Sequence, residues 1–203
     1  MAAAHDCIRV PAGDPRYPRT IQQSLGERAP AVITACGNLQ ILASRKLGLF
    51  CSARCPGSLI LQTYDLIRQL RDTGVTLVSG FHTPMEKECL ALLLRGQQPV
   101  VVCLARGLKG MRLPSAWQAP LEDGRLVLLS TFAAERRRVT AELAAVRNEL
   151  VAALADEVLV THAAPDSKTE RLCRNVRAWG KPLLTLDSSA NANLVALGAR
   201  LVK

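Results

Sequence analysis

Short, nearly continuous apolar segments recur along the chain and alternate with longer, partly polar ones. Apolar runs of this length, rich in Val, Leu and Ile, are typical of strands that are buried on both faces of a parallel sheet. They are bounded by Gly, Pro, Ser or Asp, which favours turns at their ends. The segments expected to form strands are residues 31–37, 46–52, 75–79, 100–104, 126–129, 157–161 and 182–186.

The longer segments carry apolar residues at helical spacing. In residues 58–74 the apolar positions recur at helical intervals, Ser58 can cap the amino end, and Gly74 can end the helix. Gly and Pro punctuate residues 106–117, which indicates a loop. Further helices are expected over residues 85–95, 140–154, 167–179 and 190–197. This alternation predicts an α/β fold: a Rossmann-like, doubly wound, mostly parallel sheet with helices on both faces.

The domain organisation follows from length and local composition. A chain of 203 residues is long enough for one domain with a substantial core. Residues 1–30 are rich in Pro, Gly and Arg, so we expect an irregular amino-terminal lead-in that packs on the main domain. Residues 31–203 are expected to form the Rossmann-like domain, and no internal repeat or low-complexity segment divides them.

Composition narrows the class of protein. Hydrophobic residues make up 49% of the chain and aromatic residues only 3%, which favours an α/β core over an aromatic-rich β-sandwich. The longest apolar runs are far too short to cross a bilayer, and the amino terminus lacks the long apolar segment of a signal peptide. We therefore expect a cytoplasmic protein with no membrane partner.

The cysteines are seven in number and scattered, mostly inside apolar runs. In such surroundings a thiol behaves as a small hydrophobic group, so we expect reduced cysteines in the core. Cys51 and Cys55 have a C-x-x-x-C spacing, but no second pair or nearby histidine completes a four-ligand zinc site. No metal site is expected.

The chain is strongly basic, with a formal charge of +9 and a pI of about 9.6. Such a charge is compatible with a polyanionic partner and with fast electrostatic encounter. Most of the excess is dispersed, and the dense run Arg136-Arg137-Arg138 can equally be the solvated start of a helix. Charge alone therefore does not identify the partner.

In a doubly wound sheet the loops that follow the strands gather along one edge, where ligands bind. The first such loop contains Ser52, Arg54 and Gly57 just before a helix, so backbone N–H groups and a guanidinium could meet a phosphate there. The loop lacks both the G-x-G-x-x-G pattern and the Lys-Ser/Thr ending of a P-loop. We therefore expect neither a dinucleotide nor ATP, and no other cofactor.

Other positions on the same edge are further candidates for DNA or phosphate binding. They are Ser79 and Gly80 after a strand, Arg147 and Asn148 within a helix that leads into a strand, and Lys168 at a helix start. Each also has a purely structural explanation. Small residues suit a tight turn, an amide can satisfy loop backbone, and a cation can be surface charge.

Catalytic chemistry finds little support. His82 and His162 lie in loops after strands, but no serine or cysteine nucleophile is evidently paired with them. No catalytic residue is expected. Phe50, Phe81 and Phe132 lie at strand ends, where phenylalanine is more typical of core packing than of base stacking.

Four segments, taken in order, resemble motifs of the DprA/Smf family of DNA-processing proteins, and the resemblance runs from Tyr17 nearly to the carboxyl end. Residues 50–54, FCSAR, resemble the family's V-G-S-R turn, and residues 79–86, SGFHTPME, resemble its S-G-x-A-x-G-I-D segment. Residues 147–156, RNELVAALAD, resemble R-N-R-I-I-A-x-L-S-D, and residues 192–199, ANLVALGA, resemble the final G-x-N-x-L-I-x-x-G-A. Several motifs in one order make the resemblance specific.

The chain also departs from the family pattern. A side chain in place of a turn glycine can occlude an anion or change the backbone angles, so these departures put the ligand of the pocket in question. Cys51 and Pro84 replace glycines, Leu90 falls where a histidine is usual, and Thr131 and His162 take acidic positions. Lys168 replaces the glycine of an S-G pair.

The resemblance implies a Rossmann-like domain that binds single-stranded DNA without cleaving it, in DNA uptake and recombination. Family members help to load RecA recombinase, so a RecA-type recombinase and a homodimer are implied partners. The chain stops soon after Gly198-Ala199, so no carboxyl-terminal winged helix is expected.

Two alternatives stay open. The altered turns could form a differently shaped pocket, giving a nucleotide-binding sensor or a protein-interaction module of the same superfamily. The related LOG proteins, which are phosphoribohydrolases, carry a P-G-G-x-G-T signature, but this chain has PDSKTE at residues 165–170. A hydrolase is therefore the weaker alternative.

Overall fold

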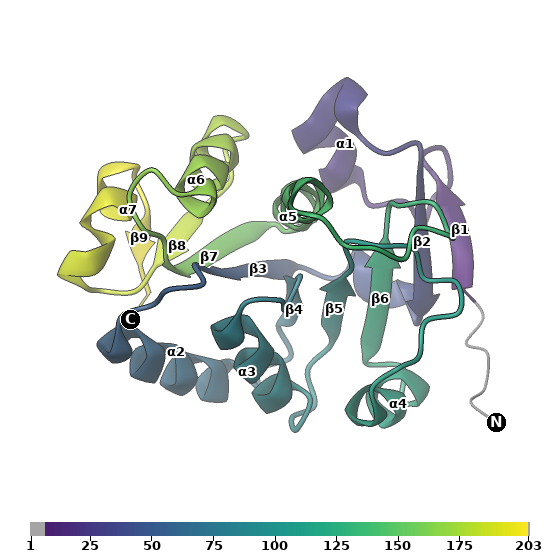
Figure 1. Cartoon of the computed structure of the whole chain (residues 1–203), viewed down its shortest axis with the longest axis horizontal. Coiled ribbons are helices and arrows are strands. Elements are labelled where there is room, and N and C mark those ends of the chain that lie inside the picture. Colours follow the sequence, from purple (N-terminus) through teal and green to yellow (C-terminus); the bar gives the residue numbers. More distant parts are fainter. Residues whose placement is uncertain (1–6, 203) are drawn as a thin grey trace.

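The computed structural model describes residues 7–202 as one mixed sheet flanked by helices (Figure 1). The strands are β1 (Cys7–Pro11), β2 (Val32–Gly37), β3 (Lys46–Cys51), β4 (Thr76–Ser79), β5 (Val100–Cys103), β6 (Leu126–Ser130), β7 (Glu157–His162), β8 (Leu183–Thr185) and β9 (Arg200–Leu201). The helices are α1 (Arg19–Leu25), α2 (Gly57–Leu70), α3 (Pro84–Leu93), α4 (Ser115–Glu122), α5 (Ala141–Leu154), α6 (Lys168–Ala178) and α7 (Ala192–Ala196).

The sheet is mostly parallel, as the sequence predicts. Its strand order is β1-β2-β6-β5-β4-β3-β7-β8-β9. The strands from β3 to β9 are all parallel to one another, whereas β2 is antiparallel to β6 and β1 is antiparallel to β2. The predicted doubly wound α/β fold is therefore confirmed, with an antiparallel extension at one edge.

Helices cover both faces of the sheet (Figure 1). Helices α2, α3 and α4 lie on one face, and α1, α5 and α6 lie on the other. Each face has its own hydrophobic cluster. Because side chains alternate along a strand, Val78 and Val101 pack toward α5 while Leu77 and Val102 pack toward α3. This two-sided burial explains why the strands are almost wholly apolar.

The chain reverses its direction of winding beside β3. From β3 it proceeds outward through β4, β5 and β6, and then α5 carries it back to β7 on the other side of β3. The carboxyl ends of β3 and β7 are therefore neighbours at the topological switch point. In open α/β sheets ligands bind in the crevice outside this point.

The amino-terminal segment is more regular than expected. It contains strand β1 and helix α1, so the expectation of an irregular lead-in is wrong for these residues. It does pack on the main domain: Tyr17 donates from its hydroxyl to the Pro30 carbonyl at 2.7 Å, and Thr20 donates to the Leu154 carbonyl at 3.1 Å. A short edge strand carries too few residues for its alternation to stand out in the sequence.

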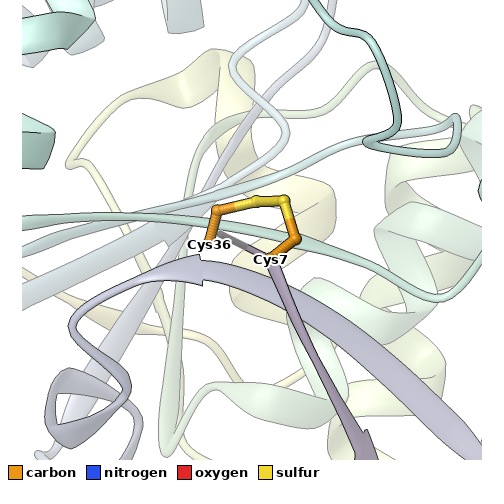
Figure 2. The surroundings of a disulfide bond; sticks show 2 residues. All are labelled: Cys7 and Cys36. Atoms are coloured by element: carbon orange, nitrogen blue, oxygen red, sulfur yellow. A yellow bond between two sulfur atoms is a disulfide. The ribbon is translucent and has the colours of Figure 1, made fainter. Parts of the chain in front are cut away.

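One cysteine pair also differs from expectation. Cys7 and Cys36 form a disulfide between β1 and β2 (Figure 2). The two residues are directly opposite each other in the strand register, with 4.3 Å between their Cα atoms. The expectation of uniformly reduced cysteines is therefore wrong for this pair. The remaining five are free thiols, and all of them except Cys55 are buried.

Smaller differences concern the ends of elements. Helix α4 begins at Ser115, within the last three residues of the segment expected as a loop, and continues beyond it to Glu122. The last expected helix is divided into a 3₁₀ turn at Ser189–Asn191 followed by α7. The other expected helices and strands are confirmed within a few residues. Among residues 7–202, no helix combines the length and apolar character needed to cross a membrane.

Candidate nucleic-acid interface

A cleft of about 880 Å³ opens at the switch point. Its walls come from the loop after β3, the first turns of α2, the amino end of α3 and the end of β7. The lining residues are Ala53, Arg54, Cys55, Pro56, Ile60, Tyr64, Pro84, Met85, Lys87, Glu88, His162 and Ala164. We call this the switch-point cleft.

The loop after β3 carries three of the predicted site residues. Ser52 donates from its backbone N–H to the His162 carbonyl at 2.9 Å, which holds the start of the loop against the end of β7. Arg54 lines the cleft, is exposed, and forms no ion pair with any residue between 7 and 202. Gly57 begins α2 a few residues later. Of these three residues Arg54 lines the cleft itself, and Ser52 and Gly57 lie immediately before and after the lining segment 53–56.

The amino end of α2 is open. Its N-cap residue is Pro56, no side chain caps its first turn, and this turn contains no acidic residue. A Cβ placed on Gly57 would have no neighbouring atom within 4 Å. The first backbone N–H groups of a helix have no partner within the helix, and the helix dipole favours negative charge beside them. This end of α2 can therefore accept an anion next to Arg54.

The amino end of α3 is closed by its own carboxylate. Thr83 caps the helix, and Glu86 returns to the preceding loop in a capping box. One oxygen of Glu86 accepts from the backbone N–H of His82 at 3.0 Å and of Thr83 at 3.3 Å. The other oxygen accepts from the backbone N–H of Cys51 at 3.1 Å. The donors at this site are therefore already used.

Glu86 is buried, with only 2% of its surface exposed. Burial by itself raises the pKa of Glu86. The interactions with the side chain and backbone of His82 and with the backbone of Cys51 lower this pKa by more than burial raises it, so the net pKa lies below the ordinary value. The carboxylate is thus charged at neutral pH. It ties the end of β3 to the turn after β4.

Arg147 fills the space behind this turn. It is 2% exposed, and its guanidinium donates to the Cys103 carbonyl at 3.2 Å and to the Asn148 side chain at 2.7 Å. It also lies 2.8 Å from Nδ1 of His82. Burial lowers the pKa of Arg147, and the negative charge of Glu86 opposes that shift. Arg147, held by Asn148, therefore connects the middle of α5 to the end of β5 and to the loop after β4.

The turn after β4 requires glycine at position 80. A Cβ on Gly80 would overlap the guanidinium of Arg147. Ser79, which is fully buried, accepts from the backbone N–H of Phe81 at 3.2 Å. Phe81 itself has a φ of 46°, which is unusual for a non-glycine residue. Gly80 thus packs against Arg147, and Ser79 holds the turn from within; the predicted contact of both residues with phosphate stays a prediction.

Lys168 lies at the other rim of the site, as the exposed first residue of α6. It is close to the amino end of α5: the Thr140 hydroxyl is the main cause that lowers the pKa of Glu142, and the charge of Lys168 adds to it. The amino end of α6 is capped by Ser167, which accepts from the backbone N–H of Glu170 at 3.1 Å. Lys168 is therefore available only as a side-chain cation.

Glu170, in the first turn of α6, also supports the carboxyl edge of the sheet, and the sequence analysis missed it. It is 4% exposed, accepts from the backbone N–H of Asp166 at 2.9 Å, and accepts from the side chain of Asn193 at 2.7 Å. It therefore holds the loop after β7 against α7. Glu86 and Glu170 both occupy the last position of a Ser/Thr-x-x-Glu pattern, TPME and SKTE, and this signal is visible in the sequence.

The two histidines of this edge are both held by neighbouring side chains. His162 is 7% exposed, lines the cleft, and its Nδ1 lies 3.0 Å from the side-chain oxygen of Asn191. His82 is engaged by Arg147 and Glu86. Across residues 7–202, no group of three or more His, Cys, Asp or Glu side chains is arranged to hold a metal ion.

The family model of DNA recombination-mediator protein A matches residues 9–203. This chain belongs to that family. The match covers nearly the whole chain and confirms the family resemblance seen in the motifs. A search of curated protein sequences finds no match.

Solved structures show the same fold. DNA processing protein A from Streptococcus pneumoniae superposes with a TM-score of 0.80 at 20% identity, over 96% of this chain and 70% of that one. The Helicobacter pylori DNA processing protein A, described for its single-stranded DNA binding mode, superposes with a TM-score of 0.79 at 18% identity, over 99% of this chain and 93% of that one. A molybdenum cofactor binding protein from Rippkaea orientalis superposes with a TM-score of 0.54 at 12% identity, over 79% of this chain and 90% of that one.

Proposed function

We propose that this protein binds single-stranded DNA at the switch-point cleft and performs no chemistry on it. The observation that carries the proposal is the open amino end of α2 beside the unpaired Arg54, at the one crevice where an α/β sheet of this topology ordinarily binds ligands. Membership of the DNA recombination-mediator protein A family and the described activity of the Helicobacter pylori protein support the choice of ligand.

In this proposal the site residues have two kinds of role. Arg54, the backbone N–H of Gly57 and the hydroxyl of Ser52 contact a phosphate, and Lys168 contributes charge at the rim. Ser79, Gly80, Arg147 and Asn148 act from behind, because they fix the turn after β4 that borders the cleft. Arg147 is thus a positioning residue rather than a phosphate ligand.

The cellular setting is proposed from the family. The protein acts in the cytoplasm in DNA recombination or DNA uptake, it delivers bound DNA to a RecA-type recombinase, and it works as a homodimer. Its basic charge of +9 supports rapid encounter with DNA. Analytical ultracentrifugation, and pull-down of a recombinase with and without bound DNA, test the two protein partners separately.

The test is fluorescence anisotropy of a labelled single-stranded oligonucleotide across a salt series. Arg54→Ala should weaken binding about tenfold and reduce the slope of log affinity against log salt by about one, because one phosphate contact is lost. Arg95→Ala is the matched control, since Arg95 is also exposed and forms no ion pair within residues 7–202, but it follows α3, at the opposite edge of the sheet. Equal effects of the two variants would contradict the proposal.

A mononucleotide sensor is a second candidate. A volume of about 880 Å³ lies within the range of small-molecule sites, and Ile60 and Tyr64 offer an apolar wall for a base. A mononucleotide neutralises few cations, so its binding should depend only weakly on salt. Calorimetric titration with mononucleotides at two salt concentrations distinguishes this candidate from DNA binding.

A further inference from the structure

A second cleft, of about 1330 Å³, lies on the same edge of the sheet as the switch-point cleft. Two of its walls are the loops that follow β5 and β6, represented by Leu108 to Leu113 and Thr131 to Glu135. Since β3, β4, β5 and β6 are neighbouring parallel strands, these loops follow the same carboxyl edge. At about 4.8 Å per strand, β6 is about 14 Å from β3, a span that a few nucleotides can bridge.

The third wall is a part of the sheet that faces away from α1. In β1 and β2, alternate residues such as Val10 and Ile33 pack into the cluster that contains α1. The residues between them, among them Arg9, Thr34 and the Cys7–Cys36 disulfide, line the cleft instead. The antiparallel extension of the sheet thus provides a surface that the parallel part, covered by helices, does not have.

The two loops are braced against each other. Gly107 donates from its backbone N–H to the Arg136 carbonyl at 2.7 Å, and Ser130 donates from its hydroxyl to the Arg106 carbonyl at 2.7 Å. A Cβ on Gly107 would overlap the carbonyl oxygens of Ala133 and Ala134, so the two loops are in direct contact. These contacts between the two loops therefore hold the shape of the cleft.

The chemistry of the cleft suits a ligand with a flat apolar part and a negative charge. Its inner surface is apolar, with Leu108 and Leu128 buried and Phe132 half-buried near the opening. Its rim is basic. Arg9 and Arg112 are exposed and form no ion pair with any residue in the described part of the chain.

Further cations reinforce this rim, and the acids on it are partly neutralised. Arg137 packs over Gly110, 3.7 Å from the position that a Cβ would take. Lys109 pairs with Glu135 at 3.3 Å, so one of the two acidic residues of the lining, Glu135 and Glu122, is already compensated. The uncompensated charge is positive. It therefore favours an anionic occupant over a neutral or basic one of the same size.

We propose that this second cleft is a nucleotide subsite, which binds a base against Phe132 and the adjoining phosphates at Arg9 and Arg112. The inference rests on the proposed function, because the occupant is a further part of the same single strand. Three observations support the proposal: both clefts lie along the same sheet edge, so one DNA strand can reach both; the second cleft has an apolar wall large enough for a base; and its rim is basic.

The test compares oligonucleotides of increasing length by anisotropy. Arg112→Ala should weaken binding of long oligonucleotides about three- to tenfold and reduce their salt slope by about one, while the shortest oligonucleotides that bind should be unaffected. Phe132→Ala should weaken long oligonucleotides about tenfold, within the range for loss of one base stack. Arg95→Ala is again the control for loss of one charge.

The outcomes separate the two proposals. If Arg54→Ala weakens every length but Arg112→Ala and Phe132→Ala bind long oligonucleotides like the unaltered protein, the second subsite is wrong and the proposed function stands. If the unaltered protein binds no single-stranded DNA at low salt, both fail. If Arg112→Ala weakens short and long oligonucleotides equally, the cleft is not a distal subsite. Circular dichroism checks that Phe132→Ala remains folded.

Discussion

Helices α2 and α3 begin side by side at the switch-point cleft, yet their amino ends have opposite properties. In α3 a buried carboxylate, Glu86, uses the free N–H groups and ties them to β3. In α2 no side chain does so, and Arg54 stands exposed before it. The comparison teaches that sheet topology supplies several helix ends along one edge, and that capping decides which of them can accept an anion.

The two ends also differ in what supports them. Glu86 and Arg147 are each 2% exposed, and both of these buried charges contact the exposed His82 in the turn after β4. Such contacts are costly to break, because each buried charge depends on the other for compensation. The closed end is therefore a structural brace, and the open end carries the proposed binding.

The largest effect is expected at the closed end. Glu86→Ala leaves the N–H groups of Cys51 and His82 without a partner and removes the charge that compensates Arg147. We expect a loss of about 3–5 kcal/mol in the free energy of unfolding, measured by urea denaturation. Glu88→Ala, an exposed neighbour in the same helix, should change it by less than about 0.5 kcal/mol. A similar loss in both variants would contradict the role of Glu86 as a structural brace.

The next effect concerns the disulfide. Reduction of Cys7–Cys36 opens a loop with a sequence separation of 29 residues and should lower the free energy of unfolding by about 2–4 kcal/mol. Thermal unfolding with and without a dithiol reductant measures it. In Cys36→Ser the reductant should have no further effect. Affinity at the open end of α2 should stay unchanged for short oligonucleotides, because the disulfide lies in the other cleft.

The contrast can be inverted by placing an acid on α2. Ser58 is exposed in the first turn of α2, so Ser58→Glu gives this helix the negative charge that α3 already has. We expect about 0.5 kcal/mol of added stability and about tenfold weaker binding of single-stranded DNA. Ser58→Gln has nearly the same size without the charge and is the control. Unchanged DNA affinity in Ser58→Glu would place the phosphate elsewhere.

The smallest predicted difference is in the acid dependence of stability. The pKa of Glu86 is lowered in the folded protein, so its contribution is fully present above the unfolded value of about 4.3 and is lost as the pH falls through the lower folded value. Unfolding midpoints measured from neutral to acidic pH should therefore fall less steeply for Glu86→Gln than for the unaltered protein. Parallel curves would show that Glu86 does not titrate differently on folding.

Much of this architecture could be predicted from local patterns. The alternation of apolar runs with helical spacing predicts the seven inner strands and most of the helices, because burial on both faces leaves a continuous apolar signature. The loop with Ser52, Arg54 and Gly57 is likewise found from its place after a strand and before a helix. The edge strand β1 and the short helix α4 carry too little periodicity to stand out.

The fold class, the family motifs and the residues available at the sheet edge could be read from the chain before folding, since these depend on interactions between near neighbours. The burial of Arg147 against Gly80, the Cys7–Cys36 pair and the second cleft beside β1 and β2 are visible only in the folded protein. The physical reason is that burial, pairing and cavity shape depend on segments far apart in sequence, whose contacts no local pattern specifies.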